Sequence, residues 1–387
     1  VRKEAFQAMY DTFENFKNTF SSTLSGNVKK DNYFAEVKNY NSAREKALDS
    51  NKIPEKVYDN LVEAVNDRLP LLHRYIALRK KVLELDELHM YDLYTPLVKE
   101  VDMKFSYDEA KDLVVEGLNP LGEEYTNIIK EGYENRWIDV DENKGKRSGA
   151  YSSGHYGTNP YILMNWQDNV NNLFTLAHEL GHSLHSYYTH ANQPYRYGNY
   201  SIFVAEVAST CNEALLNDHM LKSTDDNKEK LYLLNHFLEG FRGTVFRQTM
   251  FAEFEHDIHV LAQKGEALTA DKLTEIYYDL NKKYFGDDLV IDDEIGLEWA
   301  RIPHFYYNYY VYQYATGYSA ATALAAQILE EGEPAVDRYK KFLKAGSSDY
   351  PIEVLKQAGV DMTSKEPILA ALDVFEEKLH EMEELLK

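Results

Sequence analysis

Apolar residues recur at intervals of three and four along most of the chain, the spacing that places side chains on one face of an α-helix. The pattern is clearest in residues 1–118, where Gly26 is the only glycine among the first 116 residues. Glycine weakens helix interiors, so its near absence favours long helices here. We therefore expect residues 1–135 to form the N-terminal helical scaffold of the protein.

Two prolines mark the expected ends of one of these helices. Pro54 suits a first helical turn, because its fixed φ is already helical and its missing N–H would lack a partner there. An apolar stripe follows it at helical spacing, formed by Val57, Leu61, Val65 and Leu69. Pro70 comes directly after this stripe and is expected to kink or break the helix.

Between residues 136 and 166 the pattern changes to alternation interrupted by glycines, which predicts a small β-sheet. The sheet leads into another helix, for which Asp168 is the expected N-cap. An exposed strand edge can pair with an extended peptide backbone, and residues 149–153 and 161–165 are the two candidates. A covered structural hairpin is the alternative interpretation. We assign residues 136–387 to the second part of one continuous domain.

The helix after this sheet carries the pattern H-E-x-x-H, formed by His178, Glu179 and His182. Residues four apart lie on the same face of a helix, so both imidazoles can reach one ion. Glu179 follows the first of them directly and can act as general base towards a water molecule without being a ligand. The pattern predicts a zinc site on this helix.

A catalytic zinc needs a third protein ligand and an open fourth position, and families differ in where that ligand falls. The metzincin spacing requires glycine and histidine where this chain has His185 and Tyr188, so that class is excluded. Shorter glutamate spacings are also excluded, because Ser201 and Ile202 occupy the required positions.

The first carboxylate downstream is Glu206, within an apolar helical run. A buried acid in such a run must be paired or bound to metal, so Glu206 is the predicted third ligand. Glu213 lies two turns further along the same face, where it can accept the second ring proton of a ligating histidine. A plain surface glutamate is an equal alternative for Glu213.

Composition narrows the class of protein further. Aspartate and glutamate outnumber lysine and arginine by 64 to 42, a net charge of −22, which disfavours nucleic acid and anionic membranes as partners. Cys211 is the only cysteine, so no intrachain disulfide can form, and we interpret it as a buried structural thiol. No apolar run reaches the length of a membrane span. These features favour a cytoplasmic protein.

Residues 299–318 are rich in tyrosine, the residue that joins an apolar ring to a hydroxyl. On a continuous helix, three of these tyrosines share the face that His304 approaches, namely Tyr307, Tyr310 and Tyr314. Such a face can donate hydrogen bonds to a developing oxyanion opposite the zinc. Tyr309 and Tyr312 remain alternatives.

The motifs together resemble the oligoendopeptidase F family, bacterial relatives of thimet oligopeptidase. The resemblance rests on residues 178–186, 203–210 and 302–317, and it extends through residues 85–94 and 344–351. It implies a mainly α-helical zincin-type metallopeptidase with a deep substrate channel, a small sheet beside the active-site helix, and a His and tyrosines at 304–314 that stabilise the oxyanion. Full members are longer and begin with an additional helical region, so we expect this chain to be a fragment or processed form.

We therefore predict a zinc-dependent endopeptidase that hydrolyses internal bonds of short peptides, with one Zn²⁺ per chain held by His178, His182 and Glu206. One alternative is a zinc carboxypeptidase of similar helical build, which needs a cation for the terminal carboxylate; the candidates are Arg242, Arg247 and Arg301. The other is a non-catalytic peptide-binding protein. An intact Glu179 argues against it, because a structural zinc site tends to fill the fourth position with another ligand.

Overall fold

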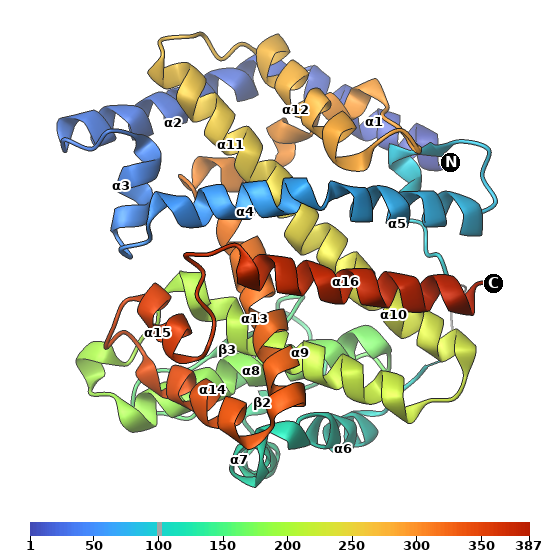
Figure 1. Cartoon of the computed structure of the whole chain (residues 1–387), viewed down its shortest axis with the longest axis vertical. Helices are drawn as coiled ribbons and strands as arrows, with labels where there is room; N and C mark the ends of the chain where they lie inside the picture. Colours follow the sequence, from blue (N-terminus) through green and yellow to red (C-terminus); the bar gives the residue numbers. More distant parts are fainter. Residues whose placement is uncertain (99–102) are drawn as a thin grey trace. The chain divides into compact units, whose positions relative to one another are not determined.

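The structure is a computed structural model of the chain and describes residues 1–98 and 103–387 (Figure 1). It is mainly helical with a small β-sheet, as the sequence predicted. The described residues form two compact units: unit 1 comprises residues 1–98 and 239–315, and unit 2 comprises residues 103–238 and 316–387. None of the helices in the described ranges combines the length and apolar character that a bilayer span requires. The division at residue 136 into two parts of one domain stays a prediction.

Unit 1 is built from helices drawn from two separate stretches of sequence. They are α1 (Arg2–Glu14), α2 (Lys17–Val37), α3 (Ala43–Asp49), α4 (Glu55–Asp67), α5 (Leu69–Val82), α11 (Arg247–Gln263) and α12 (Ala270–Phe285). A two-stranded parallel sheet joins β1 (Leu88–His89) to β5 (Leu289–Val290). The predicted break at Pro70 is confirmed, because α4 ends at Asp67 and Pro70 lies in the first turn of α5.

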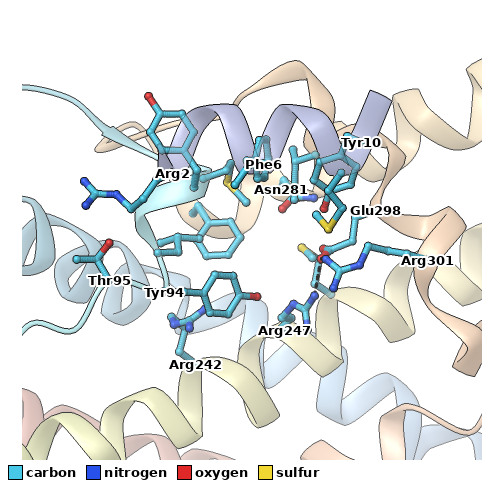
Figure 2. Close-up of a pocket in the computed structure, with 18 of the residues that line it drawn as sticks. Arg2, Phe6, Tyr10, Tyr94, Thr95, Arg242, Arg247, Asn281, Glu298 and Arg301 are labelled. Carbon is cyan, nitrogen blue, oxygen red and sulfur yellow. Dashed lines mark hydrogen bonds and ion pairs between the residues drawn. The ribbon is translucent and has the colours of Figure 1, made fainter. Parts of the chain in front are cut away.

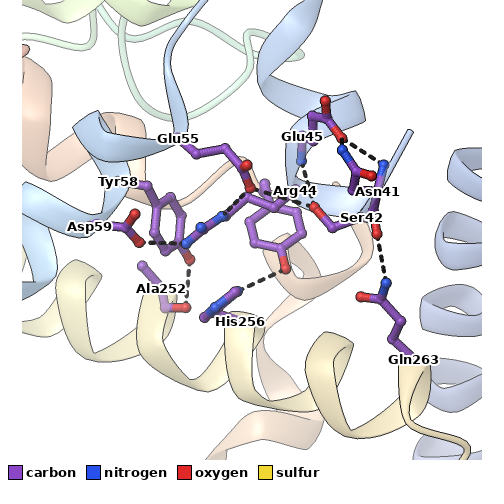
Figure 3. A network of polar contacts seen from close by, with 11 residues as sticks. Asn41, Ser42, Arg44, Glu45, Glu55, Tyr58, Asp59, Ala252, His256 and Gln263 are labelled. Carbon is purple, nitrogen blue, oxygen red and sulfur yellow. Dashed lines mark hydrogen bonds and ion pairs between the residues drawn. The ribbon is translucent and has the colours of Figure 1, made fainter. Parts of the chain in front are cut away.

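The core of unit 1 forms where α11 packs against α2, α4 and α12. The apolar stripe predicted after Pro54 lies here, with Val57, Leu61 and Val65 fully buried. Polar contacts at the edge of this core tie α3 and α4 together, because Arg44 reaches both Glu55 and Asp59, at 2.8 and 2.7 Å (Figure 3).

Unit 2 contains the remaining helices. They are α6 (Tyr107–Gly117), α7 (Glu123–Glu134), α8 (Val170–Asn192), α9 (Ile202–Ser223), α14 (Glu333–Ala345), α15 (Pro351–Gln357) and α16 (Glu366–Leu385), with most of α10 (Asn227–Phe241) and α13 (Tyr312–Glu331). Helices α8 and α9 make the most extensive contact in this unit, and α14 and the sheet pack on α8. Cys211 is buried in α9, as predicted.

The predicted sheet is present and has three strands in the order β2 (Ile138–Asp139), β4 (Tyr161–Leu163), β3 (Tyr151–Ser153). Strand β4 is central, parallel to β2 and antiparallel to β3. Its backbone is therefore paired on both sides, and the prediction that residues 161–165 offer a free edge is wrong for the strand itself. The other candidate, around Tyr151–Ser153, is an edge strand of the sheet in the described residues.

Candidate metal centre

Helix α8 presents His178 and His182 on one face, as their spacing predicted, with ring centroids 4.8 Å apart. The helix begins one residue later than expected. The side chain of Asn169 caps it by accepting a hydrogen bond from the N–H of Asn172 at 2.9 Å. The prediction that Asp168 is the N-cap was wrong, because the Asp168 carboxylate instead accepts a hydrogen bond from Trp166 Nε1.

Helix α9 brings Glu206 to these histidines. Glu206 Oε2 lies 3.4 Å from His178 Nε2 and 3.5 Å from His182 Nε2. Two ligands held about 2.1 Å from one zinc at a tetrahedral angle are separated by about 3.4 Å, so this spacing fits that ion. The ligand atoms of His178, His182 and Glu206 all lie within 4.8 Å of one another, and no other such group of histidines, cysteines and carboxylates is found among the residues that the structure describes.

Glu213 contacts the first histidine on its other ring nitrogen, with Oε1 2.5 Å from His178 Nδ1. This contact selects the tautomer with the proton on Nδ1, which leaves Nε2 free to bind an ion. Although burial disfavours the charged ring, hydrogen bonds to Glu206 and Glu213 raise the pKa of His178 to about 10, so an ion that binds Nε2 must displace its proton. The surface-glutamate interpretation of Glu213 therefore gives way to a role in orienting His178.

The ionised form of Glu206 is strongly favoured. Burial raises its pKa, but hydrogen bonds from His178 and His182 outweigh that effect and hold the pKa well below its usual range. The group thus combines two imidazoles with a carboxylate that stays charged, a donor set that suits a divalent cation.

Glu179 lies in α8 between the two histidines and is only 7% exposed. Its Oε2 atom is buried and has no hydrogen-bond partner among the described residues. Burial raises the pKa of Glu179, while the neighbouring histidines and the backbone of Ser152 oppose the shift. A buried acceptor without a partner is costly, so its presence beside the convergent ligands indicates a position reserved for a bound molecule.

The sheet is connected to the same helix. Ser152 in β3 contacts Ser183 in α8, with their Oγ atoms 2.8 Å apart. Strand β3 therefore runs beside the turn of α8 that carries Glu179 and His182. The sequence identified the strand, but the role of Ser152 was missed, because no local pattern distinguishes it from Ser153.

Gly181 was also missed as a positioning residue. A Cβ atom at this position would lie 2.5 Å from Ser209 Cα and 2.7 Å from Ala208 O, both in α9. The glycine therefore allows α8 and α9, which carry the predicted ligands, to approach closely. The available signal was a glycine in the interior of a predicted helix, where it costs about 1 kcal/mol relative to alanine and usually has a packing reason.

Residues 299–315 of the tyrosine-rich segment belong to unit 1, and the segment is not the continuous helix that the spacing predicted. Two short 3₁₀ helices, Asp293–Arg301 and Pro303–Tyr306, precede a non-helical stretch, and α13 begins only at Tyr312. Asn308 and Tyr309 have positive φ angles of 44° and 56°, which a helix does not allow.

The predicted tyrosines nevertheless surround His304. The centroid of the His304 ring lies 5.7 Å from that of Tyr307, 6.1 Å from that of Tyr310 and 5.9 Å from that of Tyr314. The hydroxyl of Tyr314 is 3.4 Å from His304 Nε2. The alternatives, Tyr309 and Tyr312, are buried and pack on Tyr58.

The chain is similar in sequence and in structure to known peptidases. The model of Peptidase family M3 matches residues 1–374. Oligopeptidase PepF of Bacillus subtilis is 74% identical over 386 residues, 100% of this chain. Two similar solved structures each cover 100% of the chain: a putative peptidase from Chlamydophila abortus, 42% identical with a TM-score of 0.94, and oligoendopeptidase-F from Enterococcus faecium, 47% identical with a TM-score of 0.83.

The chain spans only part of the length of these relatives. It matches 58% of the Bacillus subtilis protein, 64% of the Chlamydophila abortus chain and 63% of the Enterococcus faecium chain.

Proposed function

The chain belongs to peptidase family M3, and from this premise we propose that it is a zinc-dependent endopeptidase acting on internal bonds of short peptides. The observation that carries the proposal is the convergence of His178, His182 and Glu206 beside the buried, unpartnered Oε2 atom of Glu179. The names of the relatives, an oligopeptidase and an oligoendopeptidase, support the same reaction and substrate size.

In this proposal His178, His182 and Glu206 hold one zinc ion, and Glu213 keeps His178 in the required tautomer. When bound, zinc supplies Lewis-acid chemistry that polarises the scissile carbonyl and acidifies water.

Glu179 transfers the protons of the reaction. Its free Oε2 accepts a proton from the attacking water and returns it to the nitrogen of the leaving amine. The raised pKa caused by burial supports this assignment, because a proton carrier works best when its pKa is closer to the working pH.

In this proposal the oxyanion accepts hydrogen bonds from His304, Tyr307, Tyr310 and Tyr314. The support is their clustering within unit 1, where one imidazole and three phenols share a small volume. Such donors act mainly in the transition state, where charge develops on the substrate oxygen.

We further propose that strand β3 binds the substrate backbone along its open edge. Only one side of Tyr151–Ser153 pairs with β4 in the described residues, and Ser152 adjoins the helix that carries Glu179. Pairing through the main chain would hold peptides of varied sequence extended.

The endopeptidase is preferred to the two alternatives. A carboxypeptidase needs an anchor for the terminal carboxylate at its catalytic site, but Arg242, Arg247 and Arg301 line a pocket of unit 1 whose lining includes none of the proposed metal ligands. A non-catalytic binding protein has no use for Glu179. A cytoplasmic location is part of the proposal, supported by the single buried cysteine.

The test uses a short, internally quenched peptide blocked at both ends. We expect cleavage at an internal bond, loss of activity with a chelator and recovery with zinc. Release of a C-terminal residue from the unblocked peptide alone would identify a carboxypeptidase. Saturable binding of both peptides without cleavage would identify a binding protein.

A further inference from the structure

Unit 1 contains a pocket of about 570 Å³ that the proposed function does not use. Figure 2 shows side chains from α1, from the segment after β1 and from α12 gathered around it. Its volume falls within the range of about 300–1,000 Å³ that is typical of small-molecule sites. Its rim is accessible, since Tyr94 is 69% exposed and the Arg2 side chain 55% exposed.

Most of the pocket wall is apolar. It includes Phe6, Met9, Met90, Leu93, Met250 and Phe285. Methionine and aromatic side chains adapt to an apolar ligand and gain from being removed from water with it. The wall therefore favours a ligand with an apolar body.

The pocket's charges do not balance. Arg2 pairs with Asp92 at 2.7 Å, and Arg242 pairs with Glu239 at 2.7 Å. Asp92 and Glu239 are not part of the pocket lining. Glu298 is the acidic residue of the described lining, and it is shared by Arg247 at 2.6 Å and Arg301 at 3.3 Å.

Two guanidinium groups therefore face a single carboxylate oxygen, and both arginines are labelled beside Glu298 in Figure 2. One positive charge is left without a counter-charge among these pairs. Each guanidinium has five N–H donors, so Arg247 and Arg301 retain donors that a second carboxylate can accept.

A buried acceptor also faces the pocket. Asn281 is 1% exposed, its Nδ2 donates to Tyr277 O, and its Oδ1 has no partner among the described residues. Thr95 Oγ1, another buried atom of the lining, is likewise unpartnered there. Such acceptors are normally satisfied, so they indicate a ligand that also carries a hydrogen-bond donor.

We propose that this pocket binds an apolar monocarboxylate, whose carboxylate pairs with Arg247 and Arg301 and whose apolar body lies along Phe6 and Met9. The proposed ligand is an N-acyl amino acid, whose amide N–H can donate to Asn281 Oδ1; a fatty acid shares the carboxylate and the apolar body but carries no such donor. This site is independent of the proposed peptidase reaction.

The test is titration calorimetry with N-octanoylglycine, N-octanoylglycinamide and nonanoate. We expect N-octanoylglycine to bind with one site per chain and the uncharged amide to bind at least tenfold more weakly. Tighter binding of N-octanoylglycine than of nonanoate identifies the N-acyl amino acid as the ligand class, and equal binding identifies the fatty acid.

Two exposed alanines of α1 provide matched variants. Ala5 lines the pocket and Ala8 does not, so Ala5→Phe should fill the pocket and abolish binding while Ala8→Phe leaves it unchanged. Arg301→Met, which keeps the apolar stem, should weaken binding of the acid about tenfold and leave binding of the amide unchanged. The proposal is overturned if the amide binds as tightly as the acid, if Ala5→Phe binds normally, or if no saturable binding occurs at millimolar ligand.

Discussion

Glu213 contacts one of the proposed metal ligands, His178, on the ring nitrogen that faces away from the predicted ion. Its Oε1 accepts the Nδ1 proton of His178, which fixes the ring and increases the basicity of the opposite nitrogen. The sequence placed Glu213 on the correct helical face but could not separate this role from a solvated glutamate, because that depends on how α9 packs on α8.

We predict that Glu213→Ala weakens zinc binding by about 10–100-fold, the usual effect of removing such a partner. Competition with a zinc-chelating dye measures the affinity. Asp218→Asn is the matched control on the same helix, since Asp218 pairs only with Lys222 in the contacts of the described residues. Unchanged affinity in Glu213→Ala would show that Glu213 has no role in orienting His178.

Gly181 lies where α8 and α9, the two helices that carry the proposed metal ligands, approach each other closely. We predict that Gly181→Ala destabilises the protein by about 1–3 kcal/mol, because the added methyl meets backbone atoms of α9 that cannot rotate away. Zinc affinity should fall as well, because the methyl group pushes α9 away from α8 and so moves Glu206 away from the histidines.

Urea unfolding and zinc titration measure the two effects. The control is Gly26→Ala in α2, where nothing lies within 4 Å of the added Cβ. That change should leave zinc affinity unaltered and stabilise the helix by up to about 1 kcal/mol. Equal stability and zinc affinity in wild type and Gly181→Ala would contradict the close-packing account.

Glu255 hydrogen-bonds the backbone of the segment that carries His304 and its tyrosines. It is fully buried in α11, and its Oε1 accepts a hydrogen bond of 2.6 Å from the N–H of Tyr309, in the left-handed turn. A bulky residue in that conformation costs about 1–3 kcal/mol, so the turn needs such a support.

We predict that Glu255→Leu lowers kcat at least tenfold with KM and zinc content little changed, whereas Glu255→Gln, which keeps an acceptor oxygen, retains activity. Glu253→Gln is the control on the same helix, because Glu253 contacts Asn66, Lys283 and Tyr284 instead. If Glu255→Leu hydrolyses peptide at the wild-type rate, the turn does not position the catalytic side chains.

The same residue gives a pH prediction for stability. Burial raises the pKa of Glu255 to about 7, from an ordinary value of 4.5. A raised pKa means that the folded protein favours the neutral carboxyl of Glu255. The stabilisation that results is complete below about pH 4.5, where the carboxyl is neutral in both states, and it is lost as the pH rises through 7.

The free energy of unfolding of wild type minus that of Glu255→Gln should therefore fall between these pH values, by an amount on the order of 3 kcal/mol. Urea unfolding at several pH values measures this difference. A difference that stays constant across the range would show that Glu255 titrates normally.

For the whole molecule, local pattern predicted the helical class, the sheet and the convergence of His178, His182 and Glu206, because each depends on spacing within one or two elements. It could not predict the conformation around Tyr309, which depends on Glu255, 54 residues earlier in the chain. Nor could spacing reveal that unit 1 draws on two separated stretches, since that is a property of packing. The deep substrate channel stays a prediction.

The central claim is that the donor set of α8 and α9 holds a catalytic zinc and that Glu179 carries the reaction's protons. Glu179→Gln tests it most directly, because the amide keeps the size of the side chain but cannot accept the proton. Zinc content and kcat on the end-blocked peptide are measured on the same preparation. We predict one zinc per chain with kcat lowered by roughly three or more orders of magnitude; a variant that retains zinc and hydrolyses the peptide at the wild-type rate would contradict the account.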